Sequence, residues 1–132
     1  MMSFKDSGYV PFTAAEALEE GQRVVLREGG LLVADATQAG IGVNRFAAES
    51  GAPAGVALWN KPGTMEVLAA GPVGIGQAVF AAAGGAVGTL PTAEGAYTQI
   101  GVAVTACEEA GDLLEVCPVQ SGKTETVSGE GA

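Results

Sequence analysis

An internal repeat constrains the fold of this chain more than any other feature of its sequence. When the chain is shifted by 55 positions, residues 21–25 (GQRVV) align with residues 76–80 (GQAVF). At the same shift, the Gly-Gly pair at residues 29–30 aligns with the pair at residues 84–85. Repeats of this length indicate a supersecondary unit that occurs twice.

A second block repeats at a different shift. At a shift of 46 positions, residues 55–57 (GVA) align with residues 101–103. The change of shift predicts nine additional residues in the first copy, in the loop formed by residues 44–53. Because the two blocks recur in the same order, we expect a duplicated unit that covers residues 21–70 and 76–119.

Both copies show the pattern of short β-strands. The segments that are short, apolar and partly β-branched are residues 22–26, 56–59, 65–68, 78–82, 100–105 and 113–119. Turn signals at residues 61–63 (KPG) and 110–112 (AGD) predict hairpins. We therefore expect an all-β fold, a compact sandwich or barrel of short antiparallel strands built from two related halves. A capping-box pattern at residues 13–16 (TAAE) adds at most one short helix.

The two ends of the chain differ in composition from the repeat. We expect residues 1–13 to form an extended N-terminal arm, residues 14–119 a single β domain, and residues 120–132 a polar C-terminal tail. The apolar arm has to pack on its own domain or on a neighbouring molecule. The polar tail is expected to be mobile in a monomer and to become ordered on assembly.

The charge balance excludes several functions. The formal net charge is −9, from 15 acidic and 6 basic residues, and histidine is absent. The absence of histidine excludes Ser-His-Asp and Cys-His catalysis and histidine metal sites. The negative charge repels phosphate backbones, so we expect no nucleic acid partner. We expect no membrane partner, because the chain has neither a long apolar run nor an apolar signal core behind its N-terminus. Cys107 and Cys117 are expected to be free thiols.

The remaining polar groups form no recognisable catalytic or metal-binding pattern. Glu66 and Glu115 occupy similar places in the two copies, and a carboxylate pair is the minimum for glycoside hydrolysis. Each also fits the water-facing position of an alternating strand. Acidic residues within 108–112 have calcium-type oxygen ligands, but such turns are commonly just solvated. We therefore expect no catalytic site, no cofactor and no metal, and a protein that is not an enzyme.

A set of aromatic and basic residues outside the matched blocks is the candidate interface. We expect the contacts with a partner at Phe4, Lys5, Tyr9, Phe12, Arg45, Phe46 and Trp59. The residues before position 13 lie outside the repeat, and residues 45–46 lie in the loop that the second copy is expected to lack. Trp59 fits an exposed interface anchor, and it equally fits the largest side chain of the core.

The repeated motifs resemble those of tailed-phage capsid decoration (cement) proteins. The matching stretches are residues 76–87, 100–104 and 110–116, with residues 21–33 and 55–57 as the weaker first copy. The resemblance covers about residues 13–119, and the longer loop at residues 44–53 departs from the pattern. It implies a small, non-enzymatic protein on the capsid exterior of the virion, made in the host cytoplasm. The implied partners are the major capsid protein and other copies of the chain, as a homo-trimer at local threefold axes or a lattice-induced oligomer.

Two other classes of function remain open from the sequence. One is a different virion structural module, such as a tail or adhesin component. The other is a carbohydrate-binding or carbohydrate-active β domain that uses Glu66 and Glu115.

Overall fold

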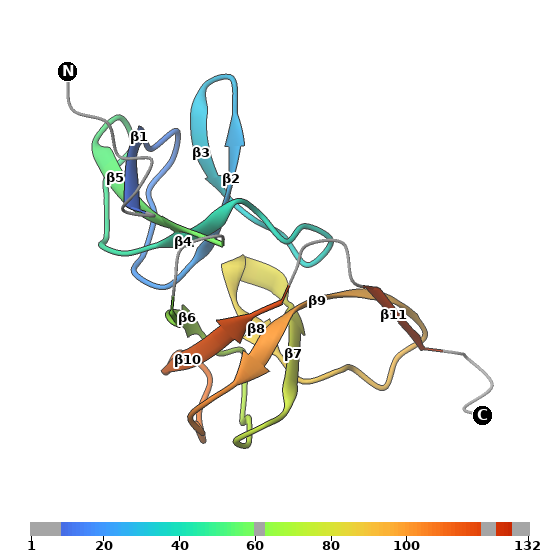
Figure 1. The fold of residues 1–132 in the computed structure, drawn as a ribbon. Helices are drawn as coiled ribbons and strands as arrows, with labels where there is room; N and C mark the ends of the chain where they lie inside the picture. Colours follow the sequence, from blue (N-terminus) through green and yellow to red (C-terminus); the bar gives the residue numbers. More distant parts are fainter. Residues whose placement is uncertain (1–8, 60–62, 120–123, 128–132) are drawn as a thin grey trace.

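The computed structural model of the chain describes residues 9–59, 63–119 and 124–127, and these residues form two antiparallel β-sheets (Figure 1). The first sheet contains β1 (Tyr9–Thr13), β2 (Arg23–Arg27), β3 (Gly30–Val33), β4 (Gly42–Asn44) and β5 (Pro53–Leu58). The second sheet contains β6 (Met65–Leu68), β7 (Ala78–Ala81), β8 (Val87–Gly88), β9 (Gly95–Ala103), β10 (Leu113–Pro118) and β11 (Thr124–Val127). The expected all-β class is confirmed.

The two sheets have the same strand order. Hydrogen-bonded neighbours follow the order β1-β5-β4-β2-β3 in the first sheet and β6-β10-β9-β7-β8 in the second, with β11 added on β9. Each sheet curls so that its two edge strands meet. Bridges join these edges: Ala14, after β1, pairs with Leu31 on β3, and Ala69, after β6, pairs with Val87 on β8. We call the part of the chain around the first sheet the first half and the part around the second sheet the second half. Strands at the same place in the two strand orders, and residues at the same place on them, are called corresponding positions.

Corresponding positions make the same hydrogen bonds in the two halves. The side-chain oxygen Oε1 of Gln22 accepts a bond of 2.7 Å from the Glu19 N–H. The same oxygen of Gln77 accepts a bond of 2.6 Å from the Gly74 N–H. The first part of each half is therefore related by the offset of 55 residues that the sequence shows.

The later part of each half follows a different correspondence from the expected one. β5 takes the place of β10, not of β9, so Gly55 does not correspond to Gly101. Gly101 on β9 corresponds instead to Gly42 on β4. Met65–Leu68, expected as the last strand of the first copy, pairs with β10 in the second sheet.

The loop after β4 is no longer than its counterpart after β9. In the first half, the N–H of Gly51 donates to the carbonyl of Ala14. In the second half, the N–H of Gly111 donates to the carbonyl of Ala69. These bonds close similar loops, so residues 44–53 are not the insertion that the alignment predicted.

No helix follows the capping-box pattern at residues 13–16, because long-range partners take the polar groups of this segment. The N–H of Ala15 donates to Leu31, and the N–H of Ala14 donates to the carbonyl of Ala52. The Glu16 carboxylate, expected to cap a helix, accepts a 2.8 Å bond from the N–H of Val33. The helical content of the described residues is one 3-10 turn at Ala83–Gly85.

One of the two expected hairpins is also absent. Residues 61–63 were expected to join the strands on either side of them, but β5 and β6 belong to different sheets. The second expected hairpin does form, because β9 and β10 pair antiparallel with Val116 opposite Ala103. A local turn signal identifies a change of direction, and it does not identify the strand that becomes the partner.

Both ends of the described chain contribute strands. Tyr9–Thr13, within the expected arm, pairs with β5 as the edge strand β1. Thr124–Val127, within the expected tail, pairs with the first part of β9 and extends away from the two halves (Figure 1). Residues 1–8 of the arm and 120–123 and 128–132 of the tail lie outside the described residues.

The two halves share part of their hydrophobic core. The larger buried cluster contains Val67, Val79, Leu114 and other side chains of the second half, and it also takes in Val43 and Ala57 from the first half. A smaller cluster belongs to the first half alone and consists of Ala14, Leu18, Val24, Leu31, Ala54 and Val56. The larger cluster therefore links the halves into one unit.

Candidate functional site

The described residues contain no group of three or more His, Cys, Asp or Glu side chains that could hold a metal ion.

Glu66 on β6 and Glu115 on β10 do lie together, directly opposite each other in the register of one antiparallel pair. They share one sheet, so they are not the corresponding positions of two copies. The Glu115 carboxylate accepts a hydrogen bond from the hydroxyl of Thr64. Two like charges placed directly opposite each other, as on Glu66 and Glu115, destabilise a sheet.

Arg45 and Phe46, from the expected interface set, form an exposed pair in the loop between β4 and β5. Phe46 is 66% exposed, and the guanidinium carbon of Arg45 lies 5.6 Å from the centre of its ring. The distance is within the range of a cation–π interaction. Both side chains are exposed, and aromatic residues and arginine are enriched in protein interfaces.

The backbone around this pair is fixed by hydrogen bonds on both sides. The N–H of Arg45 donates to Gly55 at 2.9 Å, and Ala48 exchanges two bonds with Leu18. A loop held in this way presents Phe46 in a defined position, so binding there would cost little conformational entropy.

Trp59 and Phe12 have partners within the chain. Trp59 is partly buried against the larger core cluster, and its Nε1 donates a 2.8 Å bond to the carbonyl of Gly40. Phe12 is partly buried against the smaller cluster. Tyr9 begins β1, where its backbone pairs with Ala57. Phe4 and Lys5 lie outside the described residues.

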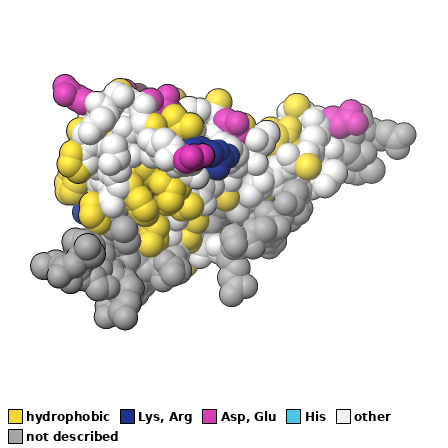
Figure 2. All heavy atoms as spheres, turned by 90° about the horizontal axis from the view of Figure 1, so that it is seen from above, with side chains coloured by type: hydrophobic (Ala, Val, Ile, Leu, Met, Phe, Trp, Pro, Cys, Tyr) yellow, Lys and Arg dark blue, Asp and Glu magenta, His cyan; other side chains and the backbone are white. Residues whose placement is uncertain are grey.

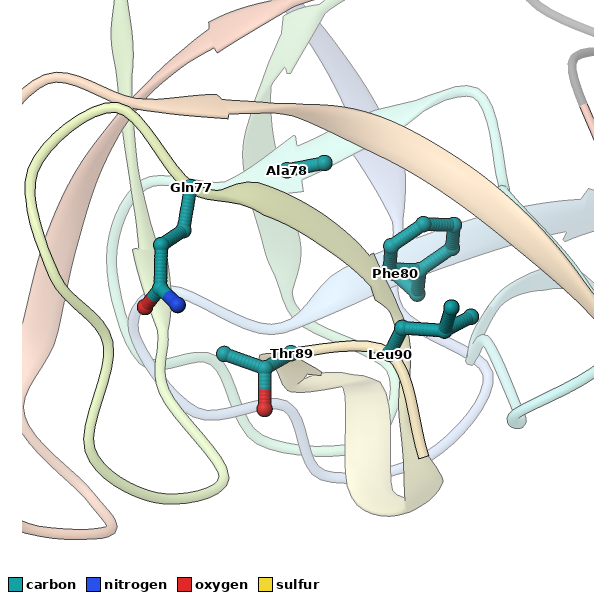
Figure 3. A pocket seen from close by; sticks show the side chains of 5 residues that line it. All are labelled: Gln77, Ala78, Phe80, Thr89 and Leu90. Carbon is teal, nitrogen blue, oxygen red and sulfur yellow. The ribbon is translucent and has the colours of Figure 1, made fainter. Parts of the chain in front are cut away.

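Three exposed apolar side chains of the second half were not singled out from the sequence. They are Ile75, which is 73% exposed, and Leu90 and Val104, each 41% exposed. Leu90 also lines a hollow of about 620 Å³ together with Gln77, Ala78, Phe80 and Thr89. In Figure 3, Phe80 and Leu90 lie at one end of this hollow and Gln77 at the other. The sequence signal for it lies in the aligned blocks GQRVV and GQAVF, where Ala78 replaces Arg23 and Phe80 replaces Val25.

The surface of the first half also carries apolar side chains. Figure 2 looks down on this half and shows hydrophobic side chains gathered in one area. Leu26 and Phe46 are the large hydrophobic side chains of this half that are exposed among the described residues. Contiguous apolar surface of this kind is typical of an interaction site.

Comparison with known proteins identifies a similarity over most of the chain. A family model described as phage cement protein matches residues 2–118. No curated protein matches the chain. Among the described residues, no helix has both the length and the apolar character needed to cross a membrane.

Proposed function

The chain belongs to the phage cement protein family, and we propose that it binds the outer surface of the phage head and stabilises contacts between major capsid subunits. Family membership makes it a phage structural protein that stabilises the capsid. The match over residues 2–118 carries the proposal, because it spans both sheets and not a single motif.

The exposed pair Arg45 and Phe46 is the proposed contact with the major capsid protein. It combines an aromatic side chain that is 66% exposed with one of the six basic residues of the chain. Phe4 and Lys5 belong to the same proposal as the segment that precedes β1. Tyr9, Phe12 and Trp59 complete the proposed interface, although the internal contacts of Phe12 and Trp59 give these two a structural role as well.

The acidity of the chain supports a position outside the shell. A protein with a net charge of −9 is repelled by packaged nucleic acid. Many copies on a closed lattice act together through effective concentration, so a modest interface per copy is sufficient. We propose synthesis in the host cytoplasm and association into a homo-trimer or an oligomer formed on the lattice.

Replacing Phe46 with aspartate is expected to weaken binding to heads at least about thirtyfold, as loss of an interface anchor does. The folded state should keep its stability, because the side chain is 66% exposed. The measurement is cosedimentation with heads that lack the protein. Val104→Asp is the matched control, because Val104 is exposed and occupies the place in the second half that Arg45 occupies in the first. Equal binding by both variants would remove Phe46 from the interface.

Removal of residues 2–8 tests the segment that carries Phe4 and Lys5. Because β1 begins at Tyr9, the truncated chain should unfold at an unchanged denaturant concentration. Its binding to heads should be weaker than that of the full chain.

Electron microscopy of the particle tests the location itself: density on the head exterior is expected, and density along the tail would contradict the proposal.

A further inference from the structure

In the first half, the segment after β3, residues 34–41, covers the start of β2. The N–H of Ala34 donates a 2.9 Å bond to the carbonyl of Arg23, so the pairing of β2 continues beyond the end of β3. The Arg23 guanidinium in turn donates to the carbonyls of Asp35 and Gln38. Backbone and side-chain bonds therefore hold this segment against β2.

The segment after β8 does not cover β7 in the same way. β8 ends at Gly88, opposite Phe80, and so does not reach Ala78, which corresponds to Arg23. Among the described residues, none of residues 89–94 donates a backbone hydrogen bond to Ala78. The hollow of about 620 Å³ lies beside Ala78 instead (Figure 3). Because a strand edge without a neighbour can pair with another strand, the start of β7 is open to one.

The chain after β8 continues instead into a ribbon that projects from the molecule. Residues 95–98 of β9 pair with β11, whereas β7 pairs with β9 from Gln99 onward. We call residues 95–98 and β11 the ribbon, and it extends away from both halves (Figure 1). No described side chain of the ribbon belongs to either buried cluster. Since an isolated pair of strands is marginally stable in water at best, the ribbon is expected to gain a partner.

The ribbon and the hollow are suited to each other in chemistry. Residues 95–98 carry no charge, and neither do the residues that line the hollow. Tyr97 is partly exposed, and its hydroxyl donates a 2.8 Å bond to the carbonyl of Ala93, which fixes the ring. Covering Phe80 and the exposed Leu90 would remove apolar surface from water. A ring that is already fixed loses little conformational entropy on binding.

We propose that the ribbon of one copy of this chain covers the hollow beside β7 of a second copy. One edge of the ribbon supplies the strand that β7 lacks beyond Gly88, as in β-strand addition. The contact provides between molecules the cover that residues 34–41 provide within the first half. The inference rests on the oligomer that is part of the proposed function, and it names the two surfaces that form it.

Cysteine cross-linking between two variants tests the contact directly. In a Cys117→Ser background, which removes the exposed native thiol, Thr89→Cys and Ala96→Cys are made as separate proteins. Both positions are exposed, and Thr89 lines the hollow whereas Ala96 lies on the ribbon. Oxidation of their mixture at high concentration is expected to give a disulfide dimer of the two variants. Dimers that form as readily from either variant alone would show a contact between like surfaces and overturn the proposal. A mixture that stays monomeric would overturn it as well.

A chain that carries both cysteines tests whether the ribbon covers the hollow of its own molecule. The expected products of its oxidation are disulfide-linked dimers and larger species. A monomer with an internal disulfide, identified by its mass and its loss of free thiols, would show that the contact forms within one chain and would overturn the proposal.

A substitution in the hollow gives a second measurement. Ala78→Arg places in the second half the side chain that the first half has at the corresponding position, and it should lower self-association in sedimentation by at least about tenfold. Ala47→Arg is the matched control, because Ala47 is exposed in the loop after β4 and does not line the hollow. Equal self-association of the two variants would contradict the proposal. If Ala78→Arg loses head binding but not self-association, the hollow contacts the capsid instead, and the proposed contact between copies is wrong.

These outcomes separate the inference from the proposed function. Self-association is measured without heads, whereas the Phe46 experiment measures binding to heads. A chain that binds heads but fails to cross-link keeps the function and loses this contact. A chain that cross-links but does not bind heads keeps the contact and loses the proposed capsid role.

Discussion

Replacing Arg23 with alanine is expected to lower the free energy of unfolding by about 3–5 kcal/mol. Arg23 is fully buried, and its guanidinium donates to backbone carbonyls in both halves. The acceptors are Asp35, Gln38 and Ala39 in the first half, and Ala82 and Ala86 in the second. Without the guanidinium, these carbonyls lose their donor at the junction between the halves, and buried acceptors left unpaired are costly.

The surroundings of Arg23 shift its pKa, and this shift determines the pH at which its contribution to stability should be measured. Burial lowers the pKa of the guanidinium to about 10, and the Asp35 carboxylate opposes this shift only in part. Arg23 is therefore charged near neutral pH in both the folded and the unfolded state, and its titration adds no pH dependence there. Between its two pKa values the unfolded chain holds more protons, so this group's contribution to stability increases as the pH rises.

Urea unfolding near neutral pH measures the effect. Arg27→Ala is the control, because Arg27 lies on the same strand but is exposed and should change stability by less than about 0.5 kcal/mol. Arg23→Lys keeps the charge with fewer donors, so its stability should fall between the native chain and the alanine variant. If Arg23→Ala unfolds like Arg27→Ala, the guanidinium does not join the two halves.

The importance of Arg23 illustrates what the sequence could and could not provide. Strand periodicity and paired glycines predicted an all-β fold, because these signals are local. The alignment of GQRVV with GQAVF also placed Arg23 opposite Ala78 in the repeat. It could not show that the guanidinium reaches carbonyls some 60 residues away, since that contact depends on how the halves pack.

Strand pairing was predicted less well, for a similar reason. Residues 61–63 have strong turn chemistry, yet the strands beside them pair with β1 and β10 and not with each other. At residues 13–16 the capping pattern competed with acceptors from distant strands, and those acceptors prevailed. In both places local sequence described a preference, and long-range hydrogen bonds determined the outcome.

The candidate site was anticipated in part. The sequence alignment predicts that residues 45–46 lie in an insertion, and the structure shows no insertion there. The pair is nevertheless exposed, and backbone hydrogen bonds hold its loop on both sides. The hollow beside β7 was not anticipated, because its lining residues come from two segments, residues 77–80 and 89–90, that only the fold brings together.

Gly42→Ala and Gly101→Ala are each expected to lower the free energy of unfolding by about 3 kcal/mol, as overpacking of a close contact does. The two glycines occupy corresponding positions, within the matching sequences IGV at residues 41–43 and 100–102. A methyl group at Gly42 would collide with the carbonyl oxygen of Ala57, and one at Gly101 with that of Cys117. Because backbone atoms form the obstacle, a change of side-chain rotamer cannot relieve the collision.

Neither glycine has a positive φ, so the expected cost comes from the close approach of neighbouring strands and not from backbone conformation. Gly55→Ala and Gly71→Ala are the matched controls, because each has an ordinary φ and no atom within 4 Å of an added methyl group. Urea unfolding should show these controls within about 1 kcal/mol of the native chain. If one of the paired variants unfolds like the controls while the other is destabilised, the two positions are not equivalent. Similar losses at both would indicate that the shared IGV sequence has the same role in each half, which is to bring neighbouring strands into close contact.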